Sequence, residues 1–179
     1  TIEKINPALK QAVMLEDMGL SLANIGDEYI ELQSKNIFIE DGIAEIALVS
    51  GSGSQGILSY FVNEFRLNER STPYSFVSAV QRTGSDLITD DMDEDEIVIN
   101  RWLADDLNAK RGSSIELKYF VVGSGRKLIE KTASFIVKDI LPMDAPGLNA
   151  SLIPEFPGLA DKENCSDWDP GIPIDLDII

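Results

Sequence analysis

The chain has 179 residues, a hydrophobic fraction of 44% and a formal net charge of −16 at pH 7. This length and composition are typical of one folded domain or two small ones, and they exclude an intrinsically disordered chain. The negative charge repels nucleic acids and anionic lipids at long range, so DNA, RNA and peripheral membrane binding are set aside. The absence of histidine from the sequence removes the usual general base and the commonest zinc ligand.

The N-terminal part of the chain combines helix and strand signals. Residues 6–16 predict a helix, because Asn6 can cap its first turn and Pro7 suits the first helical position. Alternating polar and apolar residues predict a short strand pair within residues 18–33. Residues 41–51, DGIAEIALVSG, predict a second helix that ends at a glycine.

Residues 51–56 read GSGSQG and match the pattern G-x-G-x-x-G of dinucleotide-binding loops. That function needs a strand before the loop, a helix after it and an acid about 20 residues further on. Glu69 supplies an acid, but a helical pattern precedes the loop. Residues 57–66 fit both a helical spacing and a strand alternation, but their aromatic and β-branched content favours a strand after the loop. A second strand is predicted over residues 74–81. We therefore predict a plain Gly/Ser turn and no cofactor.

An acidic run, DDMDEDE, occupies residues 90–96, where six of seven side chains are carboxylates. Asp91, Asp93 and Asp95 alternate like the start of an EF-hand loop. An EF-hand also needs glycine at its sixth position and a bidentate glutamate at its twelfth, which are Glu96 and Trp102 here. We predict an exposed, self-repelling loop, with a looser cation site as the alternative.

The clearest local unit follows the acidic run. Residues 96–100, EIVIN, predict a strand, and Asn100 can cap the short helix RWLADDL that comes next. Asn108 can adopt the left-handed conformation that ends such a helix. The helix is expected to point three side chains inward: Trp102, Leu103 and Leu107.

Two longer strands complete this unit. Residues 114–122 and 128–141 alternate in polarity and flank a glycine-rich turn, GSGRK, so they predict a β-hairpin. The expected core of the unit consists of Ile97, Ile99, Leu103, Leu107, Ile115, Leu117, Phe135 and Val137.

The C-terminal segment has a different character. Six of the eight prolines lie in residues 142–173, which interrupts regular structure, yet large apolar residues recur through it. We predict an ordered, irregular segment packed on the domain. Cys165 lies in an acidic stretch that disfavours the thiolate, so we interpret it as an idle thiol. The segment also carries carboxylates that we treat as surface acids: Asp161, Glu163, Asp167, Asp169, Asp175 and Asp177.

Three stretches together resemble the large extracytoplasmic domain of bacterial ABC transporter permeases of the FtsX-like/MacB-like family. They are YFVNEFRLNERSTPYSFVSAV (60–80), EIVINRWLADDLNAKRGSSIELKYF (96–120) and FPGLADKENCSDWDPGIPIDLD (156–177). The resemblance runs from about Tyr29 to the end of the chain. Two departures occur, because Asn108 and Ser113 replace the Gly and Asp that are usual after the short helix and in the later turn.

The resemblance implies a non-catalytic role on the extracytoplasmic (periplasmic) side of the cell membrane. Such a domain is inserted between the first two transmembrane helices of a permease, and it couples their motion to an external substrate or partner. The implied partners are the remaining permease with its membrane helices, a cytoplasmic ATPase subunit or domain, and a second permease copy. The resemblance implies no catalytic, cofactor-binding or metal-binding residues, and it makes the chain a fragment of a longer protein.

The sequence as a whole predicts an α+β fold with mostly antiparallel strands and a few short helices. We expect an α+β lobe over residues 1–84, an acidic connector over 85–95, a barrel-like lobe over 96–141, and the Pro-rich irregular segment over 142–179. Two other functions stay open, namely a free-standing extracytoplasmic ligand-binding module and a carboxylate-based hydrolase that paired acids could support.

Overall fold

The computed structural model describes residues 14–25, 29–35, 38–51, 53–81, 87–89, 91–145 and 148. The chain divides into two compact units, Thr1–Gly56 and Ile57–Ile179, and each is treated by itself. Most of the predicted helix over residues 6–16 and of the Pro-rich segment over 142–179 lies outside the described residues.

The first unit contains a β-hairpin and a helix. Its elements are η1 (Glu16–Met18), β1 (Leu20–Ile25), β2 (Tyr29–Ser34) and α2 (Asp41–Ser50). β1 and β2 pair antiparallel from Leu20 opposite Ser34 to Ile25 opposite Tyr29, which confirms the predicted strand pair. Gly19 ends η1 in the left-handed region, with φ of 70°, and turns the chain into β1.

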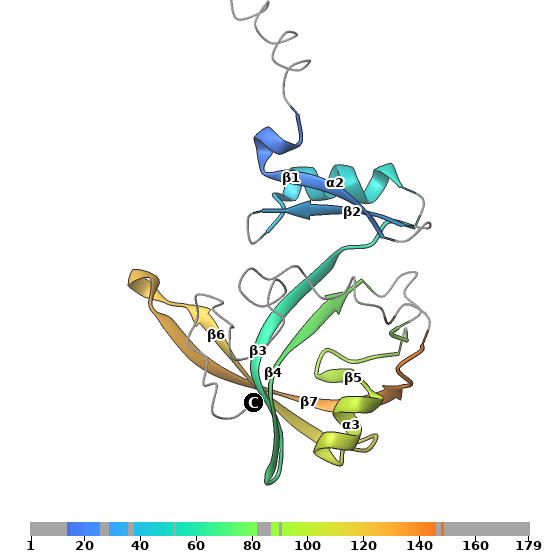
Figure 1. The fold of residues 1–179 in the computed structure, drawn as a ribbon, viewed down its shortest axis with the longest axis vertical. Coiled ribbons are helices and arrows are strands. Elements are labelled where there is room, and N and C mark those ends of the chain that lie inside the picture. The colour runs from blue at the N-terminus through green and yellow to red at the C-terminus, as the bar shows by residue number, and fades with distance from the viewer. Residues whose placement is uncertain are drawn as a thin grey trace, which may run out of the picture. The chain divides into compact units, whose positions relative to one another are not determined.

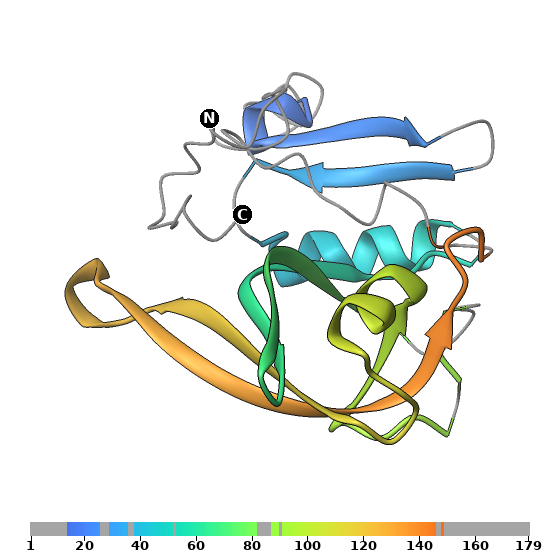
Figure 2. The same cartoon turned by 60° about the horizontal axis from the view of Figure 1, so that its bottom comes forward.

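The second unit is a five-stranded sheet with the order β4-β3-β6-β7-β5. Its elements are β3 (Ile57–Leu67), β4 (Arg70–Val80), β5 (Glu96–Asn100), α3 (Arg101–Leu107), β6 (Ser114–Val122), η2 (Ser124–Arg126) and β7 (Leu128–Leu141). β5 pairs parallel to β7, and the other neighbours pair antiparallel. The sheet curls into a half-barrel, so the predicted α+β fold with mostly antiparallel strands is confirmed (Figures 1 and 2).

The core of the second unit lies between α3 and the curled sheet. Seven of the eight predicted core side chains are buried, and the eighth, Phe135, is partly buried and packs against them. Val62 and Phe65 of β3 belong to the same cluster, with exposed fractions of 1% and 2%. The sequence pattern of β3 alone did not identify them, because both helix and strand periods fitted that segment.

The position of Trp102 contradicts the sequence analysis. Its side chain is 56% exposed, whereas Leu103, Ala104 and Leu107 form the buried face of α3. At about 100° per residue, Trp102 lies about 100° from Leu103, 160° from Ala104 and 140° from Leu107 around the helix axis, so it projects away from the buried face. The prediction that Trp102 points inward is therefore wrong.

The division of the chain also differs from the expected one. β3 and β4 were assigned to a lobe that ends at residue 84, but β3 pairs directly with β6 through Glu64 opposite Lys118. Because this pairing joins residues 57–80 to the sheet of residues 96–141, the predicted boundary in residues 85–95 is wrong. The two compact units divide after Gly56.

Candidate functional site

The acidic run is fastened to the sheet by a lysine of β7. Lys138 Nζ lies 2.9 Å from Glu96 Oε2 and 3.4 Å from Asp91 Oδ2. The same ammonium group donates a hydrogen bond to the backbone carbonyl of Asp91 at 3.1 Å. One cation thus bridges the start of the described run and the first residue of β5, which reduces the repulsion within the loop.

The surroundings lower the pKa of both bridged carboxyls. The pKa of Asp91 is lowered mainly by a hydrogen bond from Thr89 and next by the positive charge of Lys138. The pKa of Glu96 is lowered mainly by a hydrogen bond from the backbone N–H of Asp93 and next by a hydrogen bond from Lys138. Both groups are therefore ionised at neutral pH, which does not suit a general acid. Across the described residues, no three His, Cys, Asp or Glu side chains gather where they could hold a metal ion, so the looser cation site gains no support there.

The GSGSQG loop has the local context predicted for a plain turn. α2 ends at Ser50 before it, and β3 begins at Ile57 after it. A dinucleotide loop has the reverse order, in which a strand precedes the glycines and a helix N-terminus receives the pyrophosphate. The described loop residue Gly53 has φ of 78°, a conformation that glycine adopts at little cost.

The unit formed by β5, α3 and β6 has the predicted capping geometry. Asn100 Oδ1 accepts a hydrogen bond from the backbone N–H of Leu103 at 2.8 Å, and so caps α3. Asn108 ends the helix in the left-handed region, with φ of 55°. Gly112 then turns the chain toward β6 with φ of 83°. These conformations define the direction in which α3 crosses the sheet.

Two contacts bind α3 to the neighbouring strand β4. The buried hydroxyl of Thr72 donates a hydrogen bond to Asp106 Oδ2 at 2.5 Å. Arg70 Nη1 donates to the carbonyl oxygen of Asp106 at 3.0 Å. Sequence reasoning did not find this connection, because the two segments are more than 30 residues apart and carry no shared motif. The exposed Trp102 is consequently held on a firmly attached helix.

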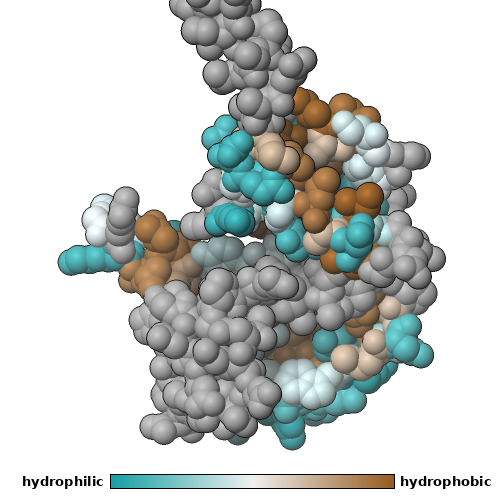
Figure 3. All heavy atoms as spheres, turned by 45° about the horizontal axis from the view of Figure 1, so that its top comes forward, coloured by the Kyte–Doolittle hydropathy of each residue, from teal (hydrophilic) through white to brown (hydrophobic). Residues whose placement is uncertain are grey.

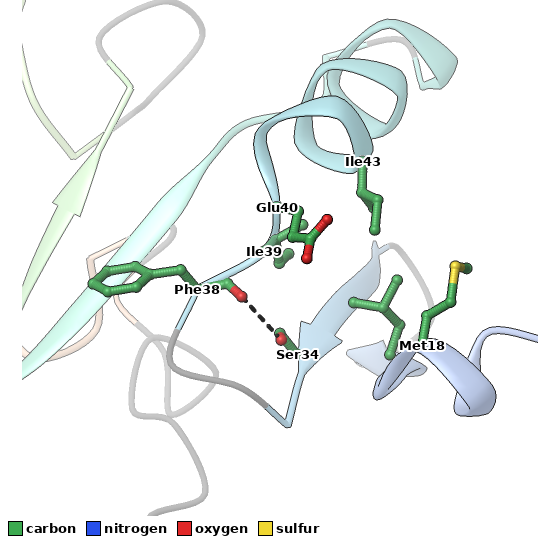
Figure 4. Close-up of a pocket in the computed structure, with 7 residues that line it drawn as sticks. Met18, Ser34, Phe38, Ile39, Glu40 and Ile43 are labelled. Carbon is green, nitrogen blue, oxygen red and sulfur yellow. Dashed lines mark hydrogen bonds between the residues drawn. The ribbon is translucent and has the colours of Figure 1, made fainter.

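The first unit contains a small pocket of about 200 Å³. It is lined mainly by apolar side chains, with Ser34 and Glu40 as polar members: Met18, Leu20, Ser34, Phe38, Ile39, Glu40 and Ile43. Figure 4 shows the ring of Phe38 turned away from the other labelled side chains, while the Ser34 hydroxyl donates to the Phe38 carbonyl oxygen at 3.2 Å. Ligand pockets are usually about 300–1,000 Å³, so this one suits a small apolar group at most.

A second hollow of about 370 Å³ lies in the second unit, where the β3–β4 turn meets the C-terminal end of α3. Its lining is largely polar or charged: Leu67, Asn68, Glu69, Arg70, Leu107 and Asn108. Leu107 belongs to the core and Arg70 is engaged with Asp106, so two lining residues already have structural roles.

The remaining candidates from the sequence are Cys165 and the acids of the C-terminal segment, which lie outside the described residues. Among the described carboxyls, each resolved pKa shift is a lowering, and each affected group accepts hydrogen bonds or faces a cation: Glu64, Asp91, Glu96 and Asp139. A hydrolase of the paired-carboxylate type needs one acid with a raised pKa.

The chain matches no family model and no curated protein. Of the helices in the described residues, none has the length and apolar character needed to cross a membrane.

Proposed function

We propose that this chain is a non-catalytic extracytoplasmic domain of an ABC transporter permease of the FtsX-like/MacB-like type. In this proposal the domain moves with the membrane helices of the permease when a cytoplasmic ATPase hydrolyses ATP. It passes that motion to a substrate or partner outside the membrane.

The observation that carries the proposal is the unit formed by β5, α3 and β6, where the sequence resembles the family most. The two departures from the usual pattern place residues that can fill the same local roles as the usual Gly and Asp. Asn108 takes a left-handed conformation with φ of 55°, as the usual glycine can. The Ser113 hydroxyl accepts a hydrogen bond from the backbone N–H of Lys110 at 3.0 Å, a role that an aspartate carboxylate can also fill.

The packing of this unit supports a mechanical role. A domain that transmits motion must move as a rigid body, because a soft domain absorbs the displacement. α3 buries Leu103, Ala104 and Leu107 against the sheet, and Thr72 and Arg70 hold its far end. β5 is locked beside β7 by parallel pairing from Glu96 to Asn100.

A free-standing ligand-binding module is the second candidate, and the pocket beside α2 is the observation that favours it. Its apolar lining with one carboxylate and one hydroxyl is the usual composition of a ligand site. Its volume of about 200 Å³ limits the ligand to a small group, so the permease domain is the better-supported proposal.

An experiment that determines on which side of the membrane the domain lies tests the proposal. The experiment uses the full-length gene product in bacterial cells, with every native cysteine, Cys165 included, replaced by serine and with Asp105→Cys placing one thiol on the exposed side of α3. A membrane-impermeant maleimide should label Asp105→Cys in intact cells after outer-membrane permeabilisation, and the cysteine-free parent should stay unlabelled. Labelling that requires lysis of the inner membrane contradicts the proposal.

A second arm of that experiment separates the two candidate functions. Affinity purification of the full-length protein in mild detergent should recover an ATPase subunit, or the same polypeptide should carry an ATPase domain. A secreted protein that purifies without detergent and without ATPase activity supports the ligand-binding module instead.

A further inference from the structure

The β-hairpin of β6 and β7 extends beyond the rest of the sheet. β3 pairs with β6 only up to Lys118, and β5 pairs with β7 only from Ile136 onward. Between these points the two strands pair only with each other among the described strands, through Val122 opposite Leu128 at the end. We call residues 119–134 the β6–β7 arm, and both ribbon views show it projecting to one side (Figures 1 and 2).

The base of the arm is braced by a tyrosine of β3. The Tyr60 hydroxyl donates a hydrogen bond to the carbonyl oxygen of Phe120. The rings of Tyr60 and Tyr119 pack edge to face, with centroids 5.8 Å apart. The arm is therefore positioned by aromatic contacts at its base, while its end is left uncovered by described strands.

The end of the arm is apolar on both faces. Val122 pairs with Leu128 and Val121 with Ile129, and neighbouring pairs of a hairpin point to opposite faces. Val122 is 65% exposed, Ile129 48% and Leu128 38%. A hairpin that packs one face on a protein core normally keeps the other face polar. Packing of one face therefore does not account for exposed apolar residues on both faces of the arm.

Basic residues accompany these apolar side chains. Lys127 and Lys131 are exposed on the arm, and the turn sequence also contains Arg126. Glu130 is the one acid in the sequence of residues 119–134. The arm is thus a positively charged segment of a chain whose net charge is −16. Figure 3 shows hydrophobic and hydrophilic residues adjoining on the projecting arm.

We propose that the end of the β6–β7 arm inserts into the interface of an anionic phospholipid bilayer. A bilayer surrounds an inserted element, so it can cover both apolar faces at once. Basic side chains beside the apolar ones then meet the anionic headgroups, which is the usual composition of an interfacial membrane anchor. The inference does not depend on the proposed transporter function, since it rests on the arm alone.

The acidity of the whole chain does not prevent this contact. A strand rises about 3.3 Å per residue, so the three steps from Tyr119 to Val122, where β6 ends and the turn begins, span about 10 Å. The Debye length at physiological ionic strength is about 8 Å. Charges on the body of the sheet are therefore largely screened at the end of the arm, and the exclusion of membrane surfaces drawn from net charge does not apply locally.

The test uses the purified 179-residue chain and sedimentation with phospholipid vesicles. One set of vesicles is phosphatidylcholine alone, and the other contains about a quarter phosphatidylglycerol. The chain should sediment with the anionic vesicles and much less with the neutral ones. The double variant Val122→Asp/Leu128→Asp should reduce the bound fraction at least about tenfold, because two charges then enter the interface.

Two further variants make the result specific to the arm. Lys127→Glu/Lys131→Glu should abolish the preference for anionic vesicles. Ile46→Asp/Val49→Asp, at apolar positions of α2 that are 66% and 83% exposed, adds the same two charges, so it is the matched control and should bind like the original chain. Circular dichroism of every variant checks that the fold is retained, as expected for exposed positions.

Several outcomes overturn the proposal. One is the absence of sedimentation with anionic vesicles, and another is binding that the arm variants leave unchanged. A third is the absence of lipid binding together with self-association, measured by sedimentation velocity, that the variant Val122→Asp/Leu128→Asp abolishes. That result would show that the arm docks to a second copy of the chain.

Discussion

At the scale of single residues, α3 carries a buried leucine and an exposed tryptophan within two turns. Leu107 is 1% exposed and Trp102 is 56% exposed. Leu107→Ala should therefore lower the free energy of unfolding by about 2–5 kcal/mol, because it removes packed methyl groups and leaves a cavity. Trp102→Ala should change that free energy by less than about 1 kcal/mol. Urea denaturation of the two variants measures the difference, and equal losses would show that the indole ring also packs.

The Asn100 cap gives a second prediction at this scale. Asn100→Ala removes the acceptor of the 2.8 Å hydrogen bond from Leu103 N–H and should cost about 1 kcal/mol of stability. Asn100→Asp keeps an acceptor at the same place and should be close to neutral. Thermal unfolding of both variants checks the cap, and it is not supported if the alanine and aspartate variants unfold at the same temperature.

Among the residues, those whose role depends on neighbours in sequence were predictable. Asn100, Asn108 and Gly112 perform the turn and cap functions that their positions indicate. Trp102 was assigned wrongly, because a helix of seven residues has too few apolar positions to define its buried face from sequence. Lys138 was not predicted as the partner of the acidic run, since its 42-residue separation from Glu96 is bridged only by folding.

At the scale of elements, a charge cluster joins β3 to β6. Glu64 Oε2 lies 2.6 Å from Lys118 Nζ, and Glu64 Oε1 lies 2.7 Å from Arg66 Nη2. Burial raises the pKa of Glu64, but hydrogen bonds from Lys118 and Arg66 outweigh it, so the net pKa is lowered. The ion pair between Glu64 and Lys118 thus stabilises the contact of β3 with β6 while the Glu64 carboxylate is ionised.

This shift predicts how stability depends on pH. A carboxyl whose pKa is lower in the folded state contributes stability above its unfolded pKa, which is about 4.3 for Glu. That contribution is lost as the pH falls from about 5 through the folded pKa. Glu64→Gln should therefore flatten the acid side of the stability profile. Urea midpoints between pH 3 and 7 provide the measurement, and an identical acid slope in both proteins would contradict the role of Glu64.

The helices and strands were largely predictable from the sequence, but the pairing of strands that are far apart in the chain was not. The strand pair near residues 18–33, the helix near 41–51 and the hairpin over 114–141 follow from local periodicity and turn residues. The parallel pairing of β5 with β7 and the contact of β3 with β6 join segments far apart in the chain. Local patterns carry no information on such pairings, so the strand order had to come from the structure.

At the scale of the whole molecule, the core cluster lies entirely within the second unit, from Val62 to Val137. A fragment that begins at Ile57 keeps every member of that cluster. We therefore expect residues 57–179 to fold cooperatively, with a melting temperature within a few degrees of that of the complete chain. Thermal unfolding followed by circular dichroism measures this, and a fragment without a cooperative transition would show that the first unit is needed for folding.

We propose that this unit transmits motion as a rigid body, and a distance measurement in the proposed full-length permease with its ATPase tests this most directly. Spin labels at Asp105→Cys and on a neighbouring membrane helix report the movement of the domain, while labels at the exposed positions Asp105→Cys of α3 and Ala79→Cys of β4 report its rigidity. We predict that ATP binding changes the first distance by several ångströms and leaves the second unchanged. If the first distance is the same with and without ATP, the domain does not couple transport to the outside.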